Sequence, residues 1–161
     1  MDQFYGAVSS LCFTLLGFWF VIVQVGHRHH LREPARRRTA IRVSLYFVLP
    51  GVMALLSLID LGEARPQALF WRAVFLVTAL IGLLDALVAA RLPRTRTTAV
   101  VTAVLYLAVA SVALSPQLTG TILPDIPPLA IEGVLLMLVV LLGLSLIWSE
   151  FLLRSQEPEE A

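Results

Sequence analysis

QFYGAVSSLCFTLLGFWFVIVQVG, residues 3–26, is an unbroken run of apolar, small and uncharged polar side chains. A helix needs about 20 predominantly apolar residues to cross the roughly 30 Å hydrocarbon core of a bilayer. Only Met1 and Asp2 precede the run, whereas a secretory signal peptide begins with basic residues. The stretch therefore predicts a first transmembrane helix that remains in the mature protein.

Four further apolar runs follow, and they predict an all-α fold, a polytopic transmembrane bundle of about five spans. The additional spans are expected at residues 43–59, 68–90, 99–115 and 129–153. Of the 161 residues, 58% are hydrophobic and 14% are charged, which leaves too little charge to cover a soluble domain. Pro50-Gly51 predicts a kink in the second span. No other segment is long enough for a second core, so residues 1–161 are expected to form one membrane domain.

The arginines predict the orientation of the chain. Ten of the twelve basic residues, all of them arginine, lie in the loops 27–42 and 91–98 or at Arg154. These positions follow the first, third and fifth spans, and only Arg65 and Arg72 fall on the other side. Cytoplasmic loops carry an excess of positive charge. We therefore expect the N-terminus outside and the C-terminus, with its short acidic tail 155–161, inside.

The same distribution predicts the surroundings of the protein. The bilayer itself is the main expected partner, and the inner arginine-rich loops are expected to contact anionic lipid headgroups. Small size and the lack of a targeting extension favour a multi-pass protein of the cell (plasma) membrane. The arginine cluster lacks interleaved aromatic side chains and adjoins a span, so nucleic-acid binding is not expected.

Small and polar residues share one face of the first span. Gly6, Ser10, Gly17 and Gln24 follow one another at helical spacing. Because lipid-facing helices are usually aliphatic all round, this stripe predicts contact with protein or water. A helix-packing seam of the small-xxx-small kind is the favoured interpretation. A pore or ligand surface is the alternative.

A second stripe follows the third span and carries the deepest charge in the chain. It consists of Trp71, Phe75, Thr78, Gly82, Asp85 and Ala89. A carboxylate in hydrocarbon is costly, so Asp85 needs a partner or access to water. Two interpretations stay open. Asp85 forms an ion pair with an arginine such as Arg91 or Arg42, or it is a protonatable or cation-attracting group in a polar pathway.

Two charged residues are expected near the outer membrane surface. Arg72 is expected to reach the headgroups with its long side chain, and pairing with Asp60, Glu63 or Glu132 is the alternative. An anion-attracting outer vestibule has less support. Glu132 is expected in the opening turn of the fifth span, where the helix dipole favours an acid.

A weak internal similarity relates the second and fourth spans. Each follows an Arg-Thr stretch and carries a Leu-Tyr pair, Leu45-Tyr46 and Leu105-Tyr106. The two pairs of spans, two with three and four with five, would then form a parallel repeat. Chance alone can give so short a match in apolar sequence.

Metal and catalytic chemistry have little support in the sequence. His27 and His30 have the spacing of one helix face, and a metal site or pH sensor there is conceivable. Such sites usually need three or four ligands, and nothing nearby completes a set. No nucleophile elbow, zinc-binding HExxH or phosphate-binding loop occurs. We therefore expect no metal, no cofactor and no enzymatic activity, with an intramembrane enzyme as the weakest hypothesis.

The leading functional hypothesis is a homo-oligomeric channel-like or transport protein. The candidate path residues are Ser10, Gly17, Gln24, Thr78 and Asp85. Because one small bundle has little room for an enclosed pathway, the polar path is expected between subunits. The alternative is a non-catalytic accessory or scaffold subunit that packs against other membrane proteins.

Overall fold

The computed structural model describes residues 2–26, 34–60, 62, 64–92, 95–117 and 127–154, apart from the side chains of 26, 34–36, 64 and 150–154. The described chain forms five α-helices: α1 Asp2–Gly26, α2 Pro34–Leu56, α3 Ala64–Ala90, α4 Arg96–Leu114 and α6 Pro128–Arg154. Each is long and apolar enough to cross a membrane. The expected all-α architecture with five candidate spans is thus confirmed, and it indicates a multi-pass membrane protein.

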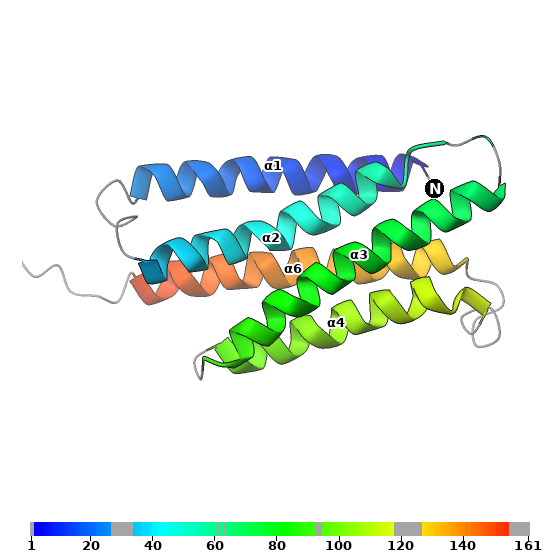
Figure 1. Ribbon diagram of the computed structural model, residues 1–161. Helices are drawn as coiled ribbons and strands as arrows, with labels where there is room; N and C mark the ends of the chain where they lie inside the picture. The colour runs from blue at the N-terminus through cyan, green and yellow to red at the C-terminus, as the bar shows by residue number, and fades with distance from the viewer. Residues whose placement is uncertain are drawn as a thin grey trace, which may run out of the picture.

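Successive helices run in opposite directions along one bundle (Figure 1). The ends of α1, α3 and α6 and the starts of α2 and α4 lie together, and we call this the arginine-rich end. Among the described side chains it carries Arg37, Arg38, Arg42, Arg91 and Arg96. The opposite end, which holds the first turn of α1, is called the N-terminal end.

The main departure from the predicted spans is the start of α2. The sequence predicts a loop over residues 34–42, but α2 begins at Pro34, nine residues before the expected span start at Val43. The reason is local: proline suits the first helical position, and arginine and alanine are good helix formers even outside hydrocarbon. The helix then continues through Pro50 to Leu56.

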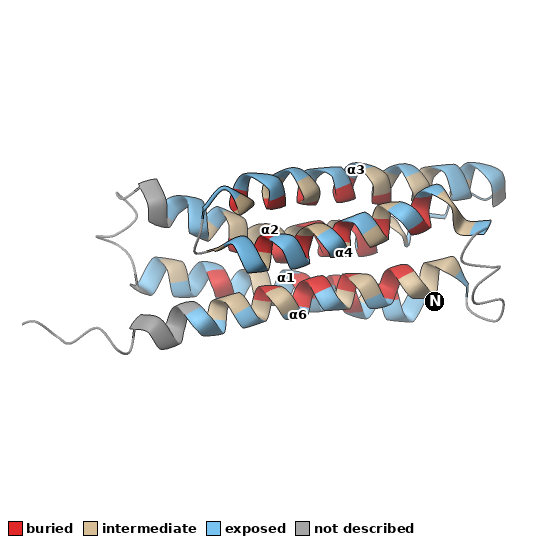
Figure 2. Cartoon of the chain, turned by 90° about the horizontal axis from the view of Figure 1, so that it is seen from below, coloured by how far each residue is buried: buried red, intermediate tan, exposed pale blue. Residues whose placement is uncertain are grey.

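The outward surface of the bundle is strongly apolar. Figure 2 shows the buried residues directed toward the helix contacts and the exposed ones outward. Phe18 is 63% exposed, Val25 80% and Trp148 65%. Soluble monomers rarely expose contiguous apolar patches of more than a few hundred Å², whereas hydrocarbon solvates such side chains readily. The surface therefore fits the membrane environment that the sequence predicts.

The five helices pack as two sequential pairs connected by the last helix. The closest pairs are α3 with α4 and α1 with α2. Helix α6 packs against both α2 and α4, and α2 also contacts α3. The Trp19 indole donates a hydrogen bond of 3.2 Å to the Ala40 carbonyl and so connects α1 with α2.

Glycines allow close approach at four of these contacts. A Cβ at Gly82 of α3 would overlap the ring of Tyr106 of α4, and one at Gly143 of α6 would lie 2.6 Å from Tyr46 Cβ of α2. The other two pairs are Gly51 of α2 with Cys12 of α1, and Gly133 of α6 with Phe4 of α1. Small residues at helix crossings are the usual device of membrane bundles, because hydrocarbon gives helices no hydrophobic reason to associate.

We predict that Gly82→Ala destabilises the protein by about 1–3 kcal/mol, the usual cost of overpacking. The added methyl would have to displace the Tyr106 ring. Val104→Ala is the control, since Val104 is 58% exposed on α4 and lies outside the proposed contacts. Denaturation in detergent with increasing sodium dodecyl sulfate measures both. Equal stability of the two variants would contradict the close α3–α4 contact.

Candidate functional site

The principal polar cluster lies in the half of the bundle nearer the arginine-rich end. Asp85 of α3 faces Arg42 of α2, with Nε–Oδ2 and Nε–Oδ1 distances of 3.3 and 3.4 Å. Their side chains are 22% and 19% exposed. Arg42 is one of the two arginines that the sequence offered as partners, and the pair gives Asp85 the counter-charge that its depth requires.

A hydrogen bond between α2 and α4 lies beside this ion pair. The Tyr46 hydroxyl and Thr102 Oγ1 are 2.6 Å apart, and Thr102 Oγ1 also lies 2.8 Å from the Thr98 carbonyl oxygen. Since a threonine hydroxyl has a single proton, Thr102 donates to Thr98 and Tyr46 donates to Thr102. The cluster therefore connects three helices through side chains that have polar partners.

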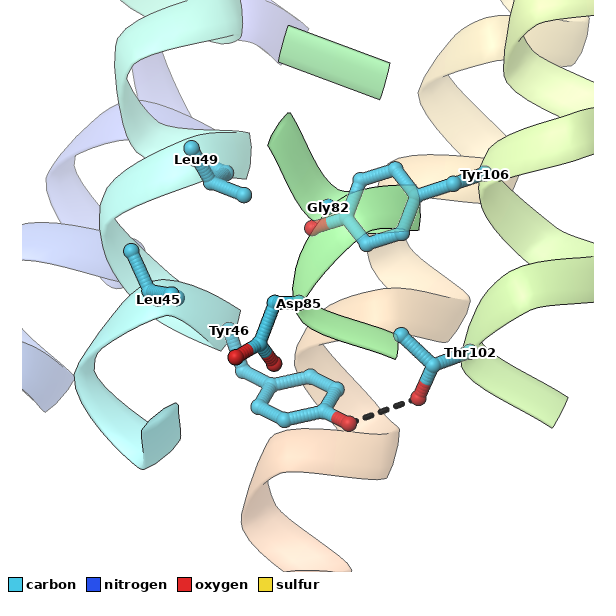
Figure 3. Close-up of a pocket in the computed structure, with 7 residues that line it drawn as sticks. All are labelled: Leu45, Tyr46, Leu49, Gly82, Asp85, Thr102 and Tyr106. Atoms are coloured by element: carbon cyan, nitrogen blue, oxygen red, sulfur yellow. Dashed lines mark hydrogen bonds between the residues drawn. The ribbon is translucent and has the colours of Figure 1, made fainter. Parts of the chain in front are cut away.

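A small cavity opens among these residues. Figure 3 shows Asp85 directed toward Tyr46, and Tyr106 extending from α4 toward Gly82 of α3. The cavity is lined by Leu45, Tyr46, Leu49, Gly82, Asp85, Thr102 and Tyr106, and its volume is about 10 Å³. About 10–15 Å³ is the minimum for one water molecule. The site can thus hold at most one water beside Asp85, and it does not offer a passage for a larger solute.

Both tyrosines of the weak internal repeat line this cavity. Tyr46 and Tyr106 come from α2 and α4, the first helices of the two proposed copies. They do different things: Tyr46 bonds Thr102, whereas Tyr106 fills the space left by Gly82. The cavity brings the two tyrosines together without giving them equivalent roles.

The structure separates the two sequence stripes instead of combining them. Thr78, 7% exposed, faces the interior and donates to the Val74 carbonyl of its own helix at 2.7 Å. Ser10, Gly17 and Gln24 are exposed on the outside of α1. The opposite face of α1 enters the core through Tyr5, Val8, Cys12 and Trp19. One chain therefore does not bring its path candidates into a common channel.

At the N-terminal end, Arg72 forms no ion pair with the described acids that the sequence offered as alternative partners. It is partly buried, its Nε has no hydrogen-bond partner, and it pairs with neither Asp60 nor Glu132. Glu63, the third candidate partner, lies outside the described residues. Among the described residues, Arg72 thus lies near one end of α3 without an ion pair to Asp60 or Glu132.

Glu132 differs most from expectation. Its side chain is fully buried, and neither carboxyl oxygen has a hydrogen-bond partner among the residues that the structure describes. The expected place in the opening turn is wrong, because α6 starts at Pro128 and its first turn contains no acid. A helix dipole stabilises an acid by about 0.3–1 kcal/mol within that turn, whereas an unpaired buried carboxylate costs on the order of several kcal/mol. The dipole therefore does not account for this residue.

The histidine candidates lie elsewhere. His27 and His30 fall outside the described residues, so the metal-site hypothesis is not tested by the geometry. Within the part of the chain that the structure describes, no three His, Cys, Asp or Glu side chains come together as metal ligands would. Sequence reasoning also missed Tyr5, the titratable neighbour of Glu132 on α1. A tyrosine among apolar residues gives no distinctive signal.

Comparison with known proteins assigns no family to this arrangement. No protein-family model matches the chain, and no curated protein or solved structure is significantly similar to it.

The Arg42–Asp85 pair should show measurable coupling in a double-mutant cycle. The cycle consists of Arg42→Ala, Asp85→Ala and the double variant. We expect a coupling free energy of about 1–2 kcal/mol, between the values for exposed and buried ion pairs. Unfolding in detergent measures the three variants. Arg38, exposed on the same helix, supplies the control: Arg38→Ala should add to Asp85→Ala without coupling. Additivity for Arg42 as well would exclude an energetically important ion pair.

Proposed function

We propose that this protein is a non-catalytic subunit of a homo-oligomer in the cell membrane, with the outer face of α1 at the subunit contact. In this assembly a narrow path for an ion or small polar solute runs along the contact. The outward position of Ser10, Gly17 and Gln24 on α1 is the observation that carries the proposal.

The closed interior of the single chain supports a path between subunits. The polar cluster around Asp85 has room for about one water. Toward the N-terminal end, the core is filled by Phe47, Met53, Phe75 and Leu136, all fully buried. Such dense apolar packing excludes water and ions. A transport function therefore needs surfaces outside the bundle of one chain.

The position of α1 supports its use as the contact. In the apolar stretch of α1 only 22% of the residues are buried, against 44% in that of α2. The main neighbour of α1 is α2. Space is open at the Cβ positions of Gly6 and Gly17. Glycines on an exposed membrane helix allow a second helix to approach closely, and Ser10 and Gln24 then supply polar groups along the seam.

An accessory or scaffold role is the second candidate. It is favoured by the same closed core and by the ion pair that neutralises Asp85, since neither requires a transported molecule. In this case the α1 face would pack against a different membrane protein, and the purified chain would be a monomer without flux.

Cysteine cross-linking tests the subunit contact. In a Cys12→Ala background, Gly17→Cys is expected to form disulfide-linked dimers in membranes under mild oxidation. Leu84→Cys is the control, because Leu84 is 54% exposed on a different helix. Cross-linking at position 84 but not at 17 would place the contact elsewhere, and no cross-linking at either would favour the accessory role.

Flux in proteoliposomes tests the path. Potassium, chloride and glycerol are the probes, and Gln24→Leu is expected to reduce the flux of the permeant probe at least about tenfold by removing a polar group from the path. Asp85→Asn, whose site lies inside the bundle, should leave that flux nearly unchanged. If Asp85→Asn reduced the flux more than Gln24→Leu, the path would instead lie inside the bundle of one chain. Absence of all flux in a cross-linked dimer would exclude transport of these probes.

A further inference from the structure

A fully buried carboxyl group without a partner is the least explained feature of the core. Glu132 is 0% exposed, and its two carboxyl oxygens have almost no accessible surface and no hydrogen-bond partner in the described part of the chain. A water molecule or a metal ion therefore does not touch these oxygens in this packing. A proton is the one ligand that needs no additional space.

The carboxyl lies in a part of α6 that contacts α1. Leu129, Glu132 and Gly133 have the i, i+3, i+4 spacing of a single helix face. The Tyr5 hydroxyl donates to the Leu129 carbonyl at 2.5 Å. Phe4 packs so closely on Gly133 that a Cβ there would lie 2.5 Å from its ring. Glu132 is thus enclosed at the point where the start of α1 closes on the start of α6.

Few charged groups are available to stabilise a carboxylate at this position. Tyr5 of α1 is the described titratable group that interacts electrostatically with Glu132. Residues 47–56 of α2 and 107–114 of α4, which form the same half of the helices packed on α6, contain no titratable side chain.

The remaining charges at this end do not bind Glu132. They are Asp2 of α1, Asp60 after α2, and Arg65 and Arg72 of α3, and none forms an ion pair with it among the described residues. Helix α3 does not pack against α6. Glu63 and Asp125 lie outside the described residues. A negative charge at Glu132 would therefore stand in apolar surroundings without compensation.

We propose that Glu132 is a proton-binding site that closes the N-terminal end of α1 against α6. A proton from water adds to one carboxyl oxygen, and the neutral acid is then buried between the two helices. When the proton returns to water, the carboxylate needs hydration, and the contact between Phe4, Tyr5 and α6 opens. The site is independent of a transport path along the outside of α1.

Infrared spectroscopy in lipid nanodiscs tests the proton directly. At pH 7 the wild-type protein is expected to show the carbonyl stretching band of a protonated carboxylic acid. Glu132→Gln should lack this band, and Asp85→Asn should retain it. Absence of the band in the wild type, or its persistence in Glu132→Gln, would overturn the proposal.

Thermal unfolding tests the consequence for packing. At pH 7 the unfolded chain has already released the proton of this glutamate, whereas the folded state still holds it. Unfolding therefore releases a proton, and stability should fall as the pH rises above 7. Between pH 7 and pH 10 the melting temperature of the wild type is expected to fall at least about 3 °C more than that of Glu132→Gln. Equal shifts would contradict the proposal. Failure of Glu132→Gln to fold would also contradict it, since glutamine reproduces the shape and neutrality of the protonated acid.

Amide hydrogen exchange locates the opening. Residues 2–8 of α1 are expected to exchange faster at the higher pH in the wild type, after correction for the intrinsic rate, and to change less in Glu132→Gln. Residues 12–20 serve as the internal reference, because Cys12 packs on Gly51 of α2 and Trp19 bonds the Ala40 carbonyl of α2. Uniform exchange along α1 would argue against a local opening at Glu132.

Discussion

In hydrocarbon, two helices gain nothing by hiding apolar side chains from each other, so the bundle depends on shape and on a few polar contacts. Glycines supply the shape. Gly82, Gly51, Gly133 and Gly143 each leave a space that a side chain of a neighbouring helix fills. The polar contacts lie close to these positions: Tyr46 and Asp85 line a cavity with Gly82, and Tyr5 bonds Leu129, one turn before Gly133. Close packing and polar pairing therefore occur at the same helix crossings.

The two intramembrane acids show how differently one fold treats the same functional group. Asp85 has an arginine within 3.3 Å and retains partial exposure. Glu132 is fully buried and has no partner among the described side chains. About eleven residues of α6 separate Glu132 from Gly143, which packs on Tyr46 beside the Asp85 cluster, and this is about 16 Å along the helix. The apolar layer between them keeps the two sites electrostatically and sterically separate.

The number and approximate place of the helices could be predicted from the sequence, because a span requires a long uncharged run and hydrophobicity records it directly. The start of α2 could not, since Pro34 to Arg42 is helical without being apolar. The face of each helix that packs against the other helices was equally hard to predict. When both faces of a helix are apolar, the contrast that marks a core in water disappears. Ser10 and Thr78 look alike in sequence, yet one is outside the bundle and the other inside. The partner of Asp85 lay in a segment predicted as loop, and the isolation of Glu132 depends on three other helices.

The position of α6 has a consequence for how the chain is assembled during synthesis. Neighbours in sequence, α1 with α2 and α3 with α4, form compact hairpins, but α6 is the helix that packs on both α2 and α4. Because membrane helices insert first and associate afterwards, the two hairpins meet mainly through the modest α2–α3 contact until the ribosome has delivered the last span. The final helix then joins the two hairpins by packing on both α2 and α4. A nascent chain stalled before Pro128 would leave the faces of α2 and α4 that pack on α6 uncovered, and membrane quality control could act on them.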